Sequence, residues 1–322
     1  MPRPDSRLSL ARLGALRRQL FNRNTLRNNE GVYLFLRSPM AIVSAIMTVL
    51  IVLGAVLAPW LAPTNPYDLA SFSLMDGLLP PAWEEGGQSR FLLGTDDQGR
   101  DMLSAILYGA RLSLTIAFLA MAFATILGVG AGLLAGYYGG RFDAIVMRIA
   151  DVQLALPAIL TALLIDGIAR GLLPRDMQED LRMYVLVLAI GLSLWVNFAR
   201  TARASAMVER NKEYVHSAII MGQHPVRIML IQILPNITGP LLVIMTVDLA
   251  SAILLEATLS FLGIGLPANS PSLGTLIRIG MQYLMSGDWW ILWVPTLFLI
   301  ALVISVNMLG DFLRQVFNPR LR

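Results

Sequence analysis

Long apolar runs alternate with shorter polar segments through most of this chain. Predominantly apolar runs cover residues 40–62, 112–137, 143–165, 183–198, 236–263 and 290–312. A helix needs ~20 consecutive apolar residues to cross the hydrocarbon core of a bilayer, because each residue adds only about 1.5 Å. The pattern therefore predicts an all-α membrane protein with six transmembrane helices.

The composition supports this class. The chain of 322 residues is 56% hydrophobic and 14% charged, whereas soluble domains carry about 25% charged residues. Cysteine is absent, which excludes disulfide bonds and thiol chemistry.

The distribution of charge predicts the orientation of the chain in the membrane. Residues 1–39 form a basic arm, which contains Arg3, Arg7, Arg12, Arg17, Arg18, Arg23, Arg27 and Arg37 against Asp5 and Glu30. The segment 63–110 after the first span is acidic instead, with Asp68, Asp76, Glu84, Glu85, Asp96, Asp97 and Asp101 against Arg90 and Arg100. Because Lys and Arg accumulate in cytoplasmic loops, we expect the arm and the tail 314–322 to be cytoplasmic, and 63–110 to be external.

Two interpretations of the basic arm stay open. Leu8, Leu13, Leu16 and Leu20 recur at helical spacing, which favours an amphipathic helix on the membrane surface. A solvated tail whose charge only sets the topology fits the same residues.

The outer segment ends in the sequence GTDDQGRD at 94–101, which is typical of a turn-rich cap before a helix. We expect a short helix over 102–108 that leads into the second span. Three aspartates lie close together here, but their spacing does not fit a calcium-binding EF-hand. We therefore expect no metal site.

Glycines and charges inside the apolar runs call for separate explanations. The sequence GVGAG at 128–132 lies within an apolar helix and lacks a following lysine, so it predicts close helix packing and not a nucleotide loop. Arg148 and Asp151 have the spacing of a structural ion pair on one helix. Asp248 and Glu256 lie within the fifth run, where a carboxylate requires water, a partner or a function.

A polar island interrupts the apolar pattern at 211–235. Helical spacing over Glu213–Met221 places Tyr214, Ala218 and Met221 on one face. Gly222 is expected to interrupt this helix, and Pro225 can open a second one that ends before Pro235. An island of this kind between two spans is either a plain loop or a docking element for a soluble partner.

The island resembles the cytoplasmic loop of binding-protein-dependent ABC importer permeases. That loop has the pattern EAA, three residues, Gly, nine residues and I-x-LP. Gly222 and Leu234-Pro235 match at the right separation, and Ala218 fits the third position. His216 and Ser217 replace the usual Glu and Ala, and Gln232 stands where Ile is usual.

Other segments are similar to the dipeptide/oligopeptide/nickel group of these permeases, and to the shorter of its two permease types. They are FLLGTDDQGRDMLSAILYGARLSL at 91–114, ILLEATLSFLGIGLP at 253–267, SPSLGTLI at 270–277 and NMLGDFLRQVFNPRLR at 307–322. The resemblance implies a type I ABC importer permease fold, in which the first helix 40–62 precedes a five-helix core at 111–313. Within that core, 201–235 would be the loop that carries a cytoplasmic coupling helix.

The resemblance also implies a function and partners. The chain would be a transport subunit of a bacterial inner membrane, coupled to its ATPase through Glu213, Tyr214, His216, Ser217, Ala218, Met221, Gly222, Leu234 and Pro235. It would work with a second homologous permease, two cytoplasmic ATPase subunits and an extracytoplasmic solute-binding protein, and not with nucleic acid. The sequence contains no G-x-x-x-x-G-K-[ST] loop, so no cofactor is expected in this chain and ATP and magnesium would be bound by the ATPase subunits.

The substrate and a second class of function remain open in the sequence. The family that the chain resembles handles peptides, nickel chelates, glutathione and related small solutes. Peptides are the default substrate, because Asp248 and Glu256 are possible polar residues of the translocation path or of an interface, where either could meet an amino terminus. The alternative function is a self-sufficient membrane channel or an intramembrane enzyme. An intramembrane enzyme would need a nucleophile with a base or paired catalytic aspartates, whereas both histidines, His216 and His224, lie in the polar island.

Overall fold

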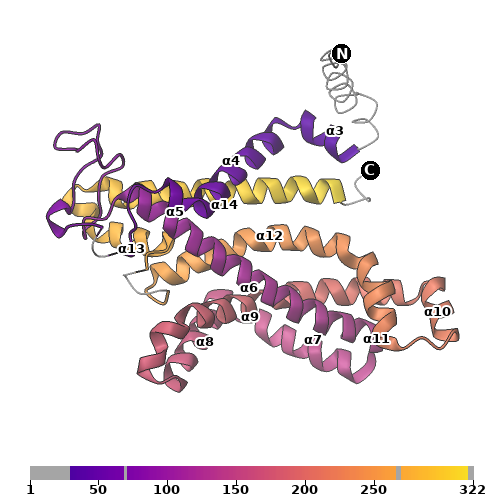
Figure 1. Ribbon diagram of the computed structural model, residues 1–322. Coiled ribbons are helices and arrows are strands. Elements are labelled where there is room, and N and C mark those ends of the chain that lie inside the picture. Colours follow the sequence, from indigo (N-terminus) through magenta and orange to yellow (C-terminus); the bar gives the residue numbers. More distant parts are fainter. Residues whose placement is uncertain (1–29, 69–70, 266–269, 318–322) are drawn as a thin grey trace, which may run out of the picture.

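The computed structural model describes residues 30–68, 71–265 and 270–317. These residues form an elongated helical bundle (Figure 1). Its long helices are α6 (Met102–Tyr138), α9 (Arg175–Arg210), α12 (Leu234–Phe261) and α14 (Trp289–Phe317). The described chain has five helices long and apolar enough to cross a membrane, or up to six if one bent helix pair counts as a span.

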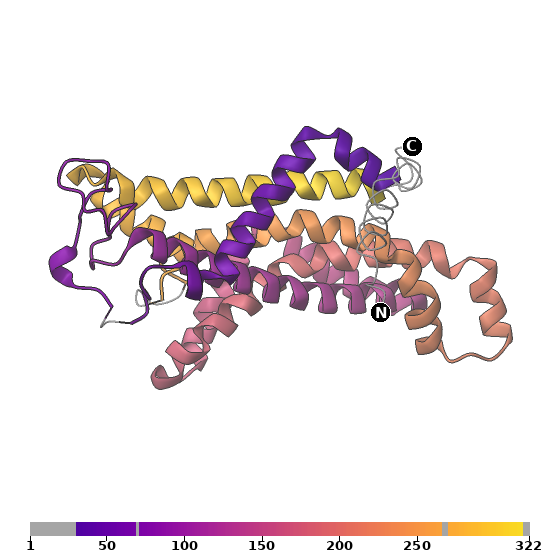
Figure 2. The same cartoon turned by 45° about the horizontal axis from the view of Figure 1, so that its top comes forward.

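The N-terminal helices pack on the outside of the bundle. They are α3 (Glu30–Arg37), α4 (Pro39–Val56) and the short α5 (Ala58–Leu61). Ser38 caps α4 by accepting a hydrogen bond from the Ala41 N–H at 3.3 Å. Helix α4 crosses α14 obliquely (Figure 2) and leaves much of its apolar surface exposed, as expected for a helix in contact with lipid. The amphipathic helix considered for the basic arm lies outside the described residues.

Helices α6 and α9 make the most extensive contact in the bundle. A β-carbon on Gly128 would lie 2.4 Å from the carbonyl oxygen of Trp195, and one on Gly132 would lie 2.2 Å from that of Ala199. Only a residue without a side chain allows the two backbones to come so close. The packing role predicted for the GVGAG segment is therefore confirmed.

The third predicted span, 143–165, is not one straight helix. The structure has α7 (Gly140–Leu154) and α8 (Ala158–Leu172), which meet at an angle of 98°. Pro157 lies at the bend; proline has no N–H and disfavours helical geometry in the residue before it. Figure 1 shows α7 beside α6. Helix α8 runs in a different direction and packs against α9.

The ion pair predicted between Arg148 and Asp151 is replaced by contacts between helices. Asp151 of α7 pairs with Arg200 of α9 at 2.5 Å, and Asp143 accepts two hydrogen bonds from the Arg203 guanidinium. The spacing of Arg148 and Asp151 allowed an ion pair within α7. The polar face of α7 lies against α9, however, so Arg200 and Arg203 of α9 bind the α7 carboxylates instead.

The outer segment caps one end of the bundle. It contains the 3₁₀ turn η1 (Leu74–Asp76), and Asp101 caps α6 by accepting from the N–H of Ser104 at 2.8 Å. This confirms the predicted cap, although the helix expected over 102–108 is the first part of α6. At the same end lie α13 (Leu273–Tyr283) and η3 (Leu284–Ser286), and Trp290 donates to the Thr95 carbonyl at 3.1 Å.

The opposite end of the bundle carries the polar island. It consists of α10 (Glu213–Ile220), α11 (Pro225–Arg227) and the π-helical turn η2 (Ile228–Ile233), which continues into α12. Helix α10 projects beyond the other helices in both views (Figures 1 and 2).

Candidate functional site

The projecting hairpin of residues 211–235 is the first candidate site. Helix α10 begins after Lys212 and turns its small apolar side inward, where Val215 and Ala218 are fully buried. Glu213, His216 and Ser217 are exposed. The short helix therefore has one face packed on its own chain and the other free.

The turn after α10 depends on glycine. Gly222 has φ +71°, a left-handed conformation that side chains disfavour. Its N–H donates to Ile219 O at 3.0 Å, and the N–H of Gln223 donates to Ala218 O at 3.1 Å. These two bonds form a Schellman motif, which satisfies the last carbonyls of the helix. The predicted interruption at Gly222 thus has a defined geometry.

Side-chain hydrogen bonds brace the hairpin against the long helices. The Tyr214 hydroxyl donates to Glu209 near the end of α9, and Asn236 of α12 donates to that hydroxyl at 3.1 Å. Gln232 donates to Gln223 at 3.0 Å across the turn. Partial desolvation, with the hydrogen bond to Glu209, raises the pKa of Tyr214 to about 12, so the phenol stays protonated at neutral pH and remains a donor.

The helix after the turn does not end at Pro235, contrary to the sequence prediction. The helical run continues from Pro225 to Phe261, and Pro235 lies in the first turn of α12. The turn before it is π-helical, with the Leu234 N–H bonded to Met229 O. This wider turn interrupts the regular hydrogen-bond ladder at the place where proline cannot donate. Pro235 therefore lies at the start of α12 and does not interrupt the continuous helical run.

The free face of the hairpin ends in three exposed apolar residues. Ile219, Ile220 and Met221 are 48%, 86% and 68% exposed. We call them the hairpin patch. Ala218, predicted to share a face with Met221, is buried beneath the patch, and Tyr214 serves partly as a brace. Sequence reasoning missed Ile219 and Ile220; the available signal was an unbroken apolar triplet within a polar island.

Two carboxylates on α12 form a second candidate site. Asp248 is 7% exposed and accepts two hydrogen bonds from the Asn197 amide, at 3.1 and 3.2 Å. It lines a cavity of about 360 Å³ together with Arg200 and Arg314. Asp248 therefore faces polar partners from α9 and the end of α14.

Glu256 lies near the other end of α12 and is completely buried. Ser260 donates to one of its oxygens at 2.7 Å, and the other oxygen has no hydrogen-bond partner among the described residues. The hydroxyls of Ser113 and Ser272 lie nearby. These residues belong to α12, α6 and the N-cap of α13. The carboxyl is thus surrounded by hydroxyl groups from three elements.

Glycine allows the elements around Glu256 to meet closely. A β-carbon on Gly274 of α13 would lie 2.2 Å from the carbonyl oxygen of Ala257. In addition, the Leu273 N–H donates to the Ser113 hydroxyl at 3.3 Å. Around Glu256, close backbone contact between α12 and α13 is therefore combined with a hydrogen bond from α13 to α6.

Comparisons with solved structures identify the fold. The chain is similar to the permease fold of the inward-facing MetNI methionine ABC transporter, with a TM-score of 0.52 and 18% identity, over 67% of this chain and 97% of that chain. This likeness confirms the predicted class: a helical membrane protein with the type I ABC importer permease fold.

Sequence comparisons establish the family. Residues 128–322 match the binding-protein-dependent transport system inner membrane component family, and residues 32–81 match the N-terminal TM domain of oligopeptide transport permease C. The dipeptide transport system permease protein DppC of Haemophilus influenzae is 37% identical over 290 residues, covering 90% of this chain and 94% of its own. The di/tripeptide transport system permease protein DppC of Pseudomonas aeruginosa is 38% identical, covering 89% of this chain and 90% of its own.

The chain belongs to the family of binding-protein-dependent transport system inner membrane components. It is a multi-pass permease subunit of an ABC transporter and not an enzyme. Neither the relatives nor the fold support the alternative of a self-sufficient channel or an intramembrane enzyme.

Proposed function

We propose that this permease imports di- and oligopeptides across the bacterial inner membrane. It works in the lipid bilayer with a second homologous permease, two cytoplasmic ATPase subunits that bind ATP and magnesium, and an extracytoplasmic solute-binding protein. The names of the relatives support the peptide substrate. The observation that carries the coupling role is the hairpin patch, an exposed apolar surface at the tip of a braced, projecting helix.

When the two ATPase subunits bind ATP and close on each other, their movement pulls on α10. The hydrogen bonds that brace the hairpin provide a route by which this movement is transmitted to the helical bundle. A force on α10 acts on α9 through the Tyr214–Glu209 bond and on α12 through the Asn236–Tyr214 bond. Helix α9 packs on α6 without space for side chains at Gly128 and Gly132, so these helices move together. Glu213, His216, Ser217 and Gly222 lie on or beside the docking helix. Leu234 and Pro235 lie where η2 continues into α12.

The arrangement of the ends supports an orientation with both termini in the cytoplasm. Helix α3 and the last turns of α14 lie toward the same end of the bundle as α10 (Figure 1). The basic residues of the arm and tail favour the cytoplasm, and the acidic segment 71–100 lies at the opposite end. In this orientation Glu256 is near the external face, where we assign it a structural role, and Asp248 faces the translocation path.

The docking role is tested by placing a charge in the hairpin patch. Ile220→Asp or Met221→Asp should weaken association with the ATPase subunits by about tenfold or more, because a buried apolar side chain contributes ~1.5–3 kcal/mol. Co-purification of the ATPase and ATP-dependent peptide uptake measure the effect.

Met75→Asp is the matched control. Met75 is 93% exposed in the outer segment, so this variant should retain its ATPase. Full ATPase retention and uptake in both patch variants would refute docking through α10.

A further inference from the structure

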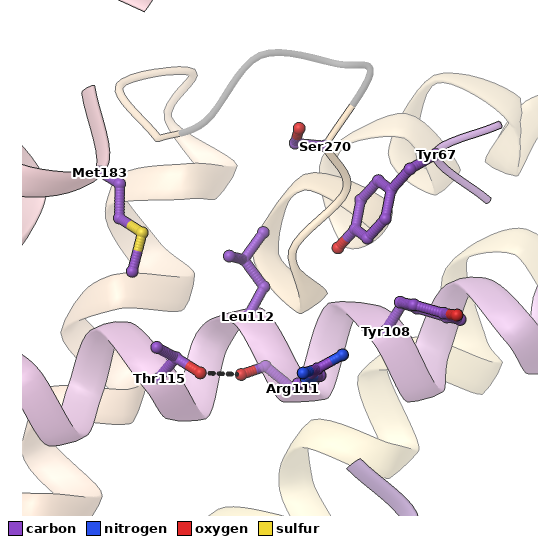
Figure 3. A pocket seen from close by; sticks show the side chains of 7 residues that line it. All are labelled: Tyr67, Tyr108, Arg111, Leu112, Thr115, Met183 and Ser270. Carbon is purple, nitrogen blue, oxygen red and sulfur yellow. Dashed lines mark hydrogen bonds between the residues drawn. The ribbon is translucent and has the colours of Figure 1, made fainter. Parts of the chain in front are cut away.

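A cavity lined by polar and apolar side chains opens at the end of the bundle opposite α10. It has a volume of about 360 Å³, within the range of small-molecule sites. Tyr108, Arg111 and Thr115 reach it from successive turns of α6, and Tyr67 and Ser270 reach it from the loops above (Figure 3). We call it the outer cavity.

Arg111 is the charged group of the outer cavity. Within residues 30–68, 71–265 and 270–317, no carboxylate forms a salt bridge with its guanidinium. It is the last charged residue before the apolar stretch 112–138 of α6. An arginine at the mouth of a span, facing a cavity and lacking an acidic partner there, is suited to bind an anion from outside.

The tyrosines beside Arg111 supply further donors and an apolar surface. The rings of Tyr67 and Tyr108 are in edge-to-face contact, with centroids 5.3 Å apart. Desolvation raises the pKa of Tyr67 to about 12, although Arg111 nearby opposes the shift. The Tyr67 phenol is therefore protonated at neutral pH and can donate a hydrogen bond.

The rest of the lining is apolar. Leu112 points into the middle of the outer cavity, and Met183 of α9 closes one side (Figure 3). A cavity with one cationic group, phenol donors and an apolar wall suits a ligand that has a carboxylate at one end and a side chain beside it.

We propose that Arg111 binds the C-terminal carboxylate of a peptide as the peptide leaves the binding protein and enters the permease. A guanidinium can form two parallel hydrogen bonds to a carboxylate, and the Tyr67 hydroxyl is placed to add a third. The peptide side chain then lies against Leu112 and Met183. This inference rests on the proposed function, since it names a recognition site within the same import path.

A lipid phosphate is the competing anion, because arginines near helix ends also reach toward headgroups. Arg111 is exposed, and the peptide is favoured because the arginine lines the outer cavity together with the loop residues Tyr67 and Ser270. The two anions predict different results when peptide and lipid are varied separately.

The test uses the assembled transporter in proteoliposomes, with Thr115→Cys as a probe of the outer cavity. The chain has no cysteine of its own, so an impermeant maleimide modifies only this position in it. With the binding protein present throughout, the dipeptide alanyl-alanine should slow modification by about tenfold, as expected for charge-assisted hydrogen bonds. Arg111→Gln should abolish the slowing, and Arg111→Lys should keep part of it. Modification of Ser89→Cys, in the outer segment, should not respond to the peptide.

Uptake by the otherwise unaltered chain provides a second measurement. At a fixed concentration of loaded binding protein, Arg111→Gln should reduce dipeptide uptake about tenfold, whereas Arg90→Gln, at an exposed arginine of the outer segment, should leave it unchanged. ATPase co-purification should be normal in both variants.

Three results would overturn the inference. If alanyl-alanine still slows maleimide modification of the cysteine at position 115 in Arg111→Gln, the peptide blocks the reagent sterically and does not bind through Arg111. Slower modification on adding phosphatidylglycerol, without an effect of peptide, would assign Arg111 to lipid. Normal uptake by Arg111→Gln would exclude it from recognition while leaving the proposed function intact, because that function fails only if the unaltered chain retains no ATPase or imports no peptide.

Discussion

At the scale of single residues, the Glu256 carboxyl is notable because it lies where α6, α12 and the start of α13 meet. It is completely buried, and hydroxyl groups of Ser113, Ser260 and Ser272 surround it. A buried polar group is costly unless it is hydrogen-bonded, and its partners are equally costly to leave unpaired. The surroundings of Glu256 therefore favour a structural acceptor that holds α13 and its loop against α6 and α12.

Substitution of Glu256 separates this role from substrate contact. Glu256→Gln keeps an acceptor and a similar shape, so assembly and most transport should be retained. Glu256→Leu removes the acceptor of the Ser260 hydroxyl and should destabilise the assembled transporter by about 1–3 kcal/mol. Thermal unfolding of the purified complex measures the difference.

Ser251→Leu on the exposed side of α12 is the control and should change stability little. If Glu256→Gln instead leaves assembly intact and alters which peptides are imported, Glu256 lines the path and the structural assignment is wrong.

At the scale of elements, the hairpin depends on one backbone conformation. Gly222 combines a positive φ with an N–H that caps α10. The braces at Tyr214 and Gln232 then hold the two sides of the turn in a fixed relation. A docking element that transmits force needs this rigidity, because a flexible loop would absorb the movement.

Changes at Gly222 test whether this geometry matters for transport. Gly222→Pro cannot adopt φ +71° and has no N–H for Ile219, so uptake should be lost while membrane insertion persists. Deletion of 213–222 should have the same effect. Uptake in proteoliposomes and the amount of protein in the membrane fraction measure the two properties.

Gly222→Asn is the graded control, because asparagine tolerates the left-handed region better than other side chains; it should retain much of the activity. Normal uptake together with normal ATPase association in the deletion variant would rule out coupling through α10.

At the scale of the whole molecule, the two ends of the bundle differ in charge and structure. One end carries the hairpin, α3 and the end of α14; the other carries the acidic outer segment and α13 (Figure 1). Helix α6, with 37 residues, is about 55 Å long at 1.5 Å per residue. It therefore extends beyond the ~30 Å hydrocarbon core and can connect the outer cavity with the inner half of the bundle.

Single cysteines test the orientation, since the chain has none of its own. Cysteines at Ser89 and at the exposed Ser286 should react with an impermeant reagent added outside intact cells. Cysteines at Ser6 and at the exposed Arg227 should react only after permeabilisation, which also serves as the positive control. The reverse labelling pattern would contradict the proposed topology.

Several features of this protein depend on local chemistry and can be predicted from the amino-acid sequence alone. Apolar runs predict spans because burial in lipid requires an apolar surface along the whole helix. Gly222 predicts the end of α10 because only glycine adopts its φ without strain, and Asp101 predicts a helix start through its capping side chain. Glycines at 128 and 132 predict close packing, although not the partner helix.

Other features depend on which elements pack together and are seen only in the folded bundle. Asp151 bonds to Arg200, and not to Arg148 three residues away in sequence, because α9 packs on the polar face of α7. Ala218 turns inward and Tyr214 becomes a brace because η2 and α12 lie beside α10. The outer cavity likewise unites Arg111 with loop residues far away in sequence. Helical periodicity shows which residues share a face, but only the packed bundle decides whether that face meets lipid, solvent or another helix.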